Sequence, residues 1–176
     1  MAVFSSTIYS GRDIQKISNF KTDAFDQKDF GCLGYMNDDK VMMFSRTFKK
    51  HTLQSVFSEK PITELPPVGI VYYYAGAKPD ILTMMAQNHR GIVIIGSGSG
   101  NYSQAWLNEI ETLAAKGIIF VRASRVNQGI VYESDVFDPH NVCIPSNTLS
   151  GQKARVLLML ALSVTQNTKE IKRIFN

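Results

Sequence analysis

The segment GSGSGN at residues 96–101 combines three glycines with polar side chains that could contact a ligand. It follows the apolar run at residues 91–95 and precedes a helical pattern that ends at Gly117. Glycines let a backbone turn tightly and approach a bound molecule closely, and Ser99 and Asn101 would supply polar atoms. Two interpretations stay open at this point: a small-ligand site, and a tight turn without a ligand.

The same turn lacks the features of a nucleotide site. A dinucleotide fingerprint needs a glycine at the position of Asn101 and an acidic residue at the end of the next strand, where this sequence has Arg122 and Arg125. No Gly-Lys-Ser/Thr triplet follows, so the pattern does not fit the phosphate-binding loop of ATPases either. We predict that the two arginines form ion pairs between elements rather than a clamp for a ligand carboxylate.

Other residues that bear chemistry are dispersed. Cys32 and Cys143 lie far apart, as do His51, His89 and His140, so the sequence predicts no metal site, no disulfide framework and no cofactor. The 19 Lys and Arg residues, against 15 Asp and Glu, are spread along the chain, which argues against nucleic-acid binding. No apolar run approaches the roughly 18 residues of a membrane span. The first residues lack a secretory signal pattern, so the chain as written is expected in the cytoplasm.

From residue 67 onwards, the elements that must position these residues alternate between strand and helix. Strands are predicted at 68–76, 91–95, 118–124 and 142–146, and helices at 80–88, before Gly117, at 152–164 with Ser150 as N-cap, and at 168–175. A continuous apolar run such as 91–95 is typical of a parallel strand covered on both faces. We therefore predict an α/β fold, a small parallel sheet with helices on both faces, and expect Tyr72–Tyr74 to pack in its core.

The first part of the chain has a different character. Residues 1–49 contain short apolar groups separated by Gly, Asn and Asp, and the segment GYMNDDKVMMF at 34–44 predicts a β-hairpin. Residues 50–66 show little periodicity before two prolines, which favours a linker. Strands without their sheet partners would have unpaired edges and exposed apolar faces, so we expect self-association or poor solubility.

Six segments, in order and spacing, resemble the bacterial type II L-asparaginases: GRDIQK (11–16), FGCLGYM (30–36), ELPPVGIVYYYAG (64–76), GSGSGN (96–101), VRASRV (121–126) and SNTLSGQKARVLLMLAL (146–162). The resemblance covers essentially the whole chain. It implies that residues 1–49 are the tail of an N-terminal domain, a β-hairpin remnant, that 50–66 are a linker and that 67–176 are the C-terminal α/β domain. It also implies an amidohydrolase that converts L-asparagine to L-aspartate and ammonia, without a cofactor, as a homo-oligomer that is tetrameric in the family.

The resemblance further implies where the substrate binds. In that family two subunits form each active site, and the glycine turn lends an asparagine side chain to the partner's site, near the α-amino and carboxylate groups of the substrate. Ser99 stands at that position here. A glutamate lent by the loop before the fourth strand corresponds to Asp135, or to Glu133 after a small register shift. A hydroxyl donates one hydrogen bond where an amide donates two, so we expect weaker substrate orientation or an altered preference between asparagine and glutamine.

The catalytic residues of the family have no counterpart in these 176 residues. The resemblance implies a threonine nucleophile in a Thr-Gly-Gly-Thr stretch, a Gly-Thr-Asp-Thr segment and an assisting lysine, and neither motif occurs. Because a hydroxyl needs a neighbouring base to act as a nucleophile, we assign no catalytic residue and expect the chain to be inactive without a complementary N-terminal half. The alternative is a non-catalytic α/β module that binds a small ligand. The family type is periplasmic, so the compartment stays open.

Overall fold

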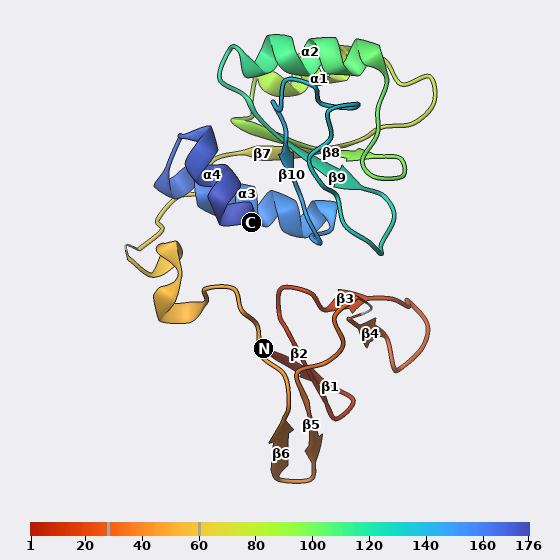
Figure 1. The fold of residues 1–176 in the computed structure, drawn as a ribbon, viewed down its shortest axis with the longest axis vertical. Coiled ribbons are helices and arrows are strands. Elements are labelled where there is room, and N and C mark those ends of the chain that lie inside the picture. Colours follow the sequence, from red (N-terminus) through yellow and green to blue (C-terminus); the bar gives the residue numbers. More distant parts are fainter. Residues whose placement is uncertain (28, 60) are drawn as a thin grey trace. The chain divides into compact units, whose positions relative to one another are not determined.

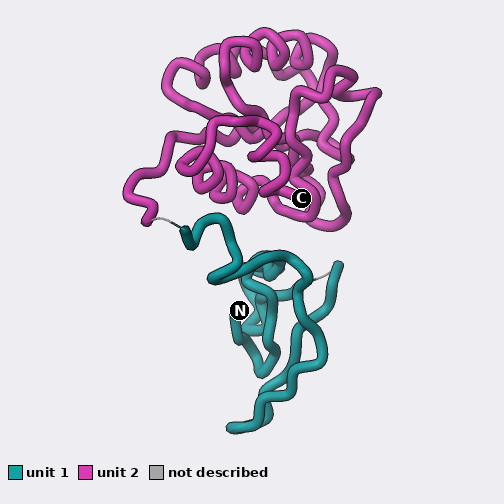
Figure 2. Tube along the Cα trace, turned by 60° about the vertical axis from the view of Figure 1, so that its left-hand side comes forward, with its two compact units in different colours: residues 1–59 teal, residues 60–176 magenta. Residues whose placement is uncertain are grey.

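The computed structural model describes residues 1–27, 29–59 and 61–176. It divides the chain into two compact units, Met1–Glu59 and Lys60–Asn176 (Figure 2). This division falls within the segment 50–66 that the sequence favours as a linker. The finer domain limits of 1–49, 50–66 and 67–176 stay a prediction.

In the first unit, four short antiparallel strands form a sheet in the order β1-β2-β5-β6 (Figure 1). They are β1 (Ala2–Phe4), β2 (Thr7–Tyr9), β5 (Gly34–Asn37) and β6 (Lys40–Met43). A second ladder joins β3 (Gln15–Lys16) to β4 (Phe25–Asp26), and 3₁₀ turns lie at Thr52–Gln54 and Val56–Ser58. The hairpin predicted at residues 34–44 is therefore confirmed.

Two-residue turns set the register of this sheet. Ser5 and Ser6, between β1 and β2, both have positive φ angles of 46° and 59°, the backbone of a hairpin turn that matches the twist of its strands. Asp38 has a φ of 52° and follows Asn37, which pairs with Lys40. The last strand, β6, has β5 as its neighbour, and all four of its residues are exposed.

The second unit contains a parallel sheet in the order β10-β9-β8-β7 (Figure 1). Its strands are β7 (Val68–Tyr72), β8 (Gly91–Gly96), β9 (Ile119–Ser124) and β10 (Ile144–Pro145). Helix α1 (Asp80–Ala86) follows β7, α2 (Gln104–Ala114) follows β8, and α3 (Gly151–Val164) and α4 (Thr168–Phe175) follow β10. The predicted α/β class is confirmed. Strand β10 is shorter than the predicted 142–146, because it lies at the sheet edge and Pro145 has no N–H for a ladder.

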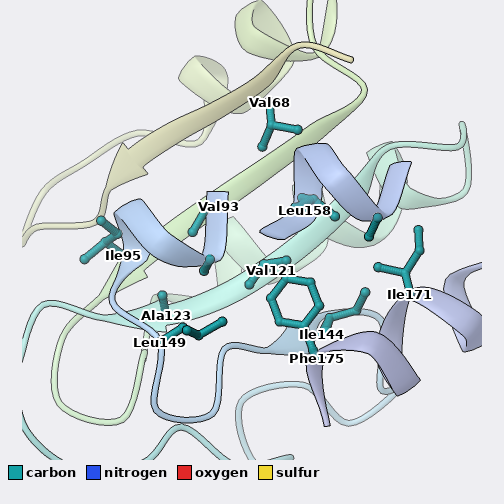
Figure 3. Packing of buried hydrophobic residues seen from close by; sticks show 12 residues of the cluster. Val68, Val93, Ile95, Val121, Ala123, Ile144, Leu149, Leu158, Ile171 and Phe175 are labelled. Carbon is teal, nitrogen blue, oxygen red and sulfur yellow. The ribbon is translucent and has the colours of Figure 1, made fainter. Parts of the chain in front are cut away.

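Helices cover both faces of the parallel sheet. On one face, α3 and α4 pack against Val93, Ile95 and Val121 (Figure 3). On the other, α1 and α2 pack against a cluster that includes Ile92 and Ile94. All six residues of β8 are buried, as expected for a continuous apolar run at the centre of a parallel sheet.

Polar side chains cap the helices of the α3–α4 layer. The Ser150 hydroxyl accepts a hydrogen bond from the Lys153 N–H at 3.4 Å, so the predicted N-cap of α3 is confirmed. At the start of α4, the Asn167 side chain accepts from the Lys169 N–H at 2.9 Å. At its end, the Asn147 amide donates to the Phe175 carbonyl at 3.0 Å. These caps fix the helices that support the sheet from which the candidate site extends.

Candidate functional site

The predicted binding residues lie on loops that leave neighbouring strands at the carboxyl edge of the parallel sheet. Open α/β sheets place their ligand sites at this edge. The turn at 97–101 follows β8 and carries Ser99, and the segment 125–143 follows β9 and carries Glu133 and Asp135. Because β8 and β9 are hydrogen-bonded neighbours, both loops start from the same part of the sheet (Figure 1).

Backbone hydrogen bonds close the glycine turn on itself. The Ser97 N–H donates to the Asn101 carbonyl at 3.0 Å, and the Asn101 N–H donates back to the Ser97 carbonyl at 2.7 Å. The Gly100 N–H also donates to the Ser97 carbonyl, at 3.0 Å. Gly98 and Gly100 have positive φ angles of 51° and 86°, which glycine adopts without steric strain.

Two of the three glycines are required by close packing inside the protein. A Cβ atom on Gly96 would lie 2.3 Å from the Gly100 carbonyl carbon, and one on Gly100 would lie 2.9 Å from Cγ of Arg122. Both approaches are shorter than ordinary van der Waals contact. Gly96 and Gly100 therefore serve the turn itself, and they leave its exposed tip to face solvent.

Ser99 occupies that exposed tip. Its carbonyl oxygen accepts a hydrogen bond from Arg122 Nη1 at 2.8 Å, whereas its hydroxyl forms no hydrogen bond with the described part of the chain. The hydroxyl is thus available to a ligand. Asn101 is placed differently, because its Oδ1 atom is buried within the turn and has no partner there among the described residues.

The acidic residues of the second loop have three distinct environments. Asp135 is exposed and makes no ion pair with the residues that the structure describes. Glu133 forms an ion pair with Lys172 of α4, with 2.6 Å between Oε1 and Nζ. Asp138 is buried, and its two carboxylate oxygens accept from the N–H groups of Val142 and Cys143 at 2.8 Å each. Of the two predicted alternatives, Asp135 is therefore the carboxylate left open to a ligand.

Arg122 is a site residue whose role the sequence did not predict. The predicted ion pairs are wrong for it: its guanidinium is buried and has no carboxylate partner among the described residues. Instead, Nη1 donates to the Ser99 carbonyl and Nη2 donates to the Tyr132 carbonyl. Backbone carbonyls carry no residue-type signal, so the pattern of charges along the chain could not reveal these partners.

The thiol of Cys143, near this edge in the described part of the chain, is not an activated nucleophile. Cys143 is buried, and burial raises the pKa of its thiol to about 12, with the Asp138 carboxylate acting in the same direction. Its neighbour Tyr102, whose hydroxyl lies 3.4 Å from Sγ, also has a pKa raised mainly by burial. A protonated thiol against a protonated phenol packs behind the loops and does not attack a substrate.

Three threonine hydroxyls lie beside a basic group, but on exposed surfaces. Their distances to the base are 2.5, 2.5 and 2.7 Å in the pairs Thr83–Glu109, Thr165–Glu170 and Thr52–His51. All three pairs are solvent-exposed and lie outside the two loops at the sheet edge. An attacking hydroxyl also needs donors directed at the developing oxyanion in a site that excludes water, and these exposed pairs do not provide such a site.

The described ranges contain no metal site and no membrane-spanning helix. Over residues 1–27, 29–59 and 61–176, no group of three or more His, Cys, Asp or Glu side chains could hold a metal ion. Across the same ranges, no helix has both the length and the hydropathy that crossing a membrane demands. The polar loops after β8 and β9 therefore remain the candidate site.

Comparisons with known proteins agree with this geometry. Residues 67–175 match the model of the glutaminase/asparaginase C-terminal domain. The chain is 35% identical over 178 residues to L-asparaginase 2 of Escherichia coli strain K12, covering 100% of this chain and 51% of that protein. It is 34% identical to a probable periplasmic L-asparaginase of Haemophilus influenzae, covering 99% and 51%. The chain thus spans about half the length of these relatives.

A solved structure extends the similarity to three dimensions. The crystal structure of a probable cytoplasmic L-asparaginase from Campylobacter jejuni is 36% identical and superposes with a TM-score of 0.87, over 98% of this chain and 56% of that one. The Haemophilus influenzae relative is a probable periplasmic protein, and the Campylobacter jejuni relative is a probable cytoplasmic one. With the domain match, the sequence identity and the superposition in agreement, the chain belongs to the glutaminase/asparaginase family and contains its C-terminal domain.

Proposed function

We propose that this chain supplies substrate-orienting groups of an L-asparaginase, and that a complementary N-terminal half supplies the nucleophile. The reaction is hydrolysis of the side-chain amide of L-asparagine to L-aspartate and ammonia. An attacking hydroxyl forms an acyl intermediate as ammonia leaves, and water then releases aspartate. In this scheme the 176-residue chain by itself does not turn over asparagine.

The observation that carries this proposal is the placement of Ser99 and Asp135. Both are exposed on loops of adjacent strands, and neither side chain is engaged by the described residues. The carboxylate of Asp135 suits the α-ammonium group of an amino acid, and the Ser99 hydroxyl suits its α-carboxylate. Both residues would act in the active site of a neighbouring subunit, as the family resemblance implies.

A fusion protein tests the proposal. The half of the Escherichia coli L-asparaginase 2 relative that has no counterpart here would be joined to this chain, and ammonia release from L-asparagine would be measured for the fusion and for the isolated chain. We expect turnover by the fusion and none by the chain. Turnover by the pure 176-residue chain would contradict the requirement for a second half.

Substitutions in the active fusion test the two residues. We expect Ser99→Ala and Asp135→Ala each to lower kcat/KM by about tenfold to a hundredfold, the effect of losing one hydrogen bond to a charged group. Glu133→Ala is the matched control, because Glu133 is engaged by Lys172, and it should change kcat/KM less than about twofold. A reversed order, with Glu133→Ala the more damaging change, would assign the carboxylate to Glu133.

The alternative function is a non-catalytic module for a small acidic ligand. It is favoured by one observation: residues 60–176 form a compact unit with hydrophobic cores on both faces of their own sheet. Such a module would bind L-aspartate, and its fusion to an asparaginase half would give no ammonia release. The fusion assay and an aspartate titration together distinguish the two functions.

The proposed use of a partner subunit requires a homo-oligomer. We propose that the chain assembles with further copies of itself, as a tetramer if it follows the family. Light scattering coupled to size-exclusion chromatography of the fusion gives the molar mass directly. A monomeric fusion that is fully active would contradict a site shared between subunits.

A further inference from the structure

We propose that Arg122 is a positioning residue, which fixes the two loops of the site relative to each other and thereby orients Ser99 and Asp135. This inference rests on the proposed function for what the loops bind. The hydrogen bonds that the Arg122 side chain donates within the described residues both go to backbone carbonyls.

A single guanidinium joins segments that are remote in sequence. Arg122 Nη1 donates to the carbonyl of Ser99, which precedes it by 23 residues, at 2.8 Å. Nη2 donates to the carbonyl of Tyr132, which follows it by 10 residues. Arg122 lies within β9, so the rigid centre of the sheet carries the link. Each of the two loops is therefore attached to the same side chain.

The burial of Arg122 indicates that the main contribution of its side chain is these two hydrogen bonds. The residue is 2% exposed, and its Nε atom has no hydrogen-bond partner among the described residues. A buried cation without a carboxylate carries a large desolvation penalty, which only directed hydrogen bonds offset. An apolar side chain of similar size would fill the same space without that penalty. Unlike an apolar side chain, the planar guanidinium can donate hydrogen bonds to two carbonyls at once.

The second loop is held on both sides of Asp135. Tyr132, three residues before it, is bound by Arg122. Asp138, three residues after it, donates its N–H to the Ser134 carbonyl at 2.8 Å and accepts from the N–H groups that lead into β10. Asp135 thus lies in a short turn, and Arg122 is one of the groups that hold the chain before it. Loss of the Arg122 hydrogen bonds would therefore give the Asp135 carboxylate more freedom to move.

Both loops have ties besides Arg122. In the first loop, the Ser124 hydroxyl donates to the Gly98 carbonyl, and the Arg125 N–H donates to the Gly96 carbonyl at 3.0 Å. In the second loop, the Val131 N–H donates to the Asn147 carbonyl at 3.0 Å, and Glu133 pairs with Lys172. We therefore expect the segments 97–101 and 131–138 both to loosen in part when Arg122 is lost.

Hydrogen exchange of backbone amides in the full 176-residue chain tests the link. The reporters are the amides of Asn101 and Asp138, which donate within their own loops. In Arg122→Met we expect the exchange of Asp138 and of Asn101 to rise severalfold, with the amide of Ile94 in β8 unchanged. Arg122→Lys keeps the charge but carries its donors on one nitrogen, which cannot replace the two separate nitrogens of the guanidinium. We therefore expect it to protect one loop and release the other.

Arg125→Met is the matched control, since Arg125 is exposed and binds the turn through its backbone N–H, which the substitution leaves in place. It should leave all three amides unchanged. Unchanged exchange in both loops of Arg122→Met, or an equal rise at Ile94, would overturn the proposal, because the second result means general destabilisation. If Arg122→Met does not fold, Arg122→Lys decides alone: protection of both loops overturns the proposal, and release of one supports it.

Calorimetric titration of the fusion protein with L-aspartate separates this inference from the proposed function. If the wild-type fusion binds L-aspartate, Arg122→Met should weaken the affinity by about tenfold and Arg125→Met should not change it. Unchanged affinity in Arg122→Met would overturn a positioning role for the binding residues. If the wild-type fusion binds no L-aspartate, that result counts against the proposed function, and the exchange rates of the 176-residue chain still decide whether Arg122 holds the loops.

Discussion

The two units of the chain bury apolar surface very differently. In residues 60–176, helices cover both faces of the parallel sheet, and the strand β8 is buried along its whole length. In the described part of residues 1–59, the buried apolar side chains are Ile8, Tyr9, Ala24 and Leu33. The strand β6 of that unit exposes every residue, including Val41 at 57% and Met42 at 52%.

The two units therefore depend on different sources of stability. Fixing the backbone of one residue costs about 1–2 kcal/mol in conformational entropy, and burial of apolar surface is the main term that offsets it. Residues 60–176 contain that burial themselves. Residues 1–59 have mainly short strands and local turns, so we expect their fold to need apolar surface from outside the unit.

The largest expected effect separates the units physically. We predict that a fragment of residues 60–176 folds and unfolds cooperatively in urea, whereas a fragment of residues 1–59 shows no cooperative transition. Far-ultraviolet circular dichroism during urea titration of both fragments measures this. A cooperative transition in the shorter fragment would show that its few buried side chains suffice, and the contrast between the units would fail.

A matched pair of leucines measures the same contrast at single residues. Leu158 of α3 is fully buried against the sheet, and Leu53 of the first unit is 92% exposed. We predict that Leu158→Ala lowers the free energy of unfolding by about 2–5 kcal/mol, and Leu53→Ala by less than about 0.5 kcal/mol. Urea denaturation of the full chain gives both values. Equal losses would mean that Leu53 is covered in solution.

Local sequence signals were sufficient for most of the fold. The apolar run at 91–95 predicted β8, and the largely apolar segment 152–164 with Ser150 as N-cap predicted α3, because each signal lies within one element. The hairpin at 34–44 was predictable for the same reason, since its turn residues stand between two short strands. Prediction was weakest where a residue's environment depends on another part of the chain.

Three tyrosines illustrate that limit. Residues 72–74 were expected to pack in the core, but Tyr72 is 51% and Tyr74 is 63% exposed. Tyr73 alone of the three packs there, with its ring centroid 5.3 Å from that of Trp106. Successive residues of an extended segment point to opposite sides, and β7 lies at the sheet edge, so alternate tyrosines reach solvent.

The candidate site shows the same limit. Ser99 was indicated by its place in the glycine turn and by the resemblance, Asp135 by the resemblance alone, and the binding role of both stays a prediction. Arg122 was expected in an ion pair. That prediction failed because the partners of Arg122 are backbone carbonyls, 23 residues before and 10 residues after it. Asp138 gave a usable signal, since an Asp-Pro pair favours a turn, but its burial depends on how residues 125–143 fold over the sheet.

The two cysteines, one in each unit, give a smaller expected effect. Cys32 is partly exposed, whereas Cys143 is buried and its thiol pKa is raised to about 12. Because the thiolate is the reactive form, we predict that Cys143 reacts with an aromatic disulfide reagent at pH 8 about a hundredfold more slowly than Cys32. Absorbance of the released thiol follows both rates, with Cys32→Ala and Cys143→Ala assigning them. Similar rates would show that the second unit opens readily.

The raised pKa of Cys143 also sets the sign of a pH effect. Between the ordinary thiol value of 9.0 and about 12, the unfolded chain binds fewer protons than the folded one. The free energy of unfolding therefore falls as pH rises through this window, and the contribution is fully present below it. In Cys143→Ala the fall should be shallower than in Cys32→Ala. The same slope in both variants would contradict burial of the thiol in solution.

The smallest expected effect concerns association through β6. Unpaired strand edges with exposed apolar side chains favour pairing with another chain, and a charged residue on the edge opposes it. We predict that Val41→Lys lowers the oligomer fraction of the full chain several-fold in size-exclusion chromatography with light scattering. Val126→Lys is the control, since Val126 is similarly exposed, at 53%, in the second unit. Because both side chains are exposed, neither change should alter the free energy of unfolding by more than about 0.5 kcal/mol. An equal fall of the oligomer fraction in both variants would mean that net charge, not β6, controls self-association. An unchanged oligomer fraction in both variants would mean that self-association does not involve β6.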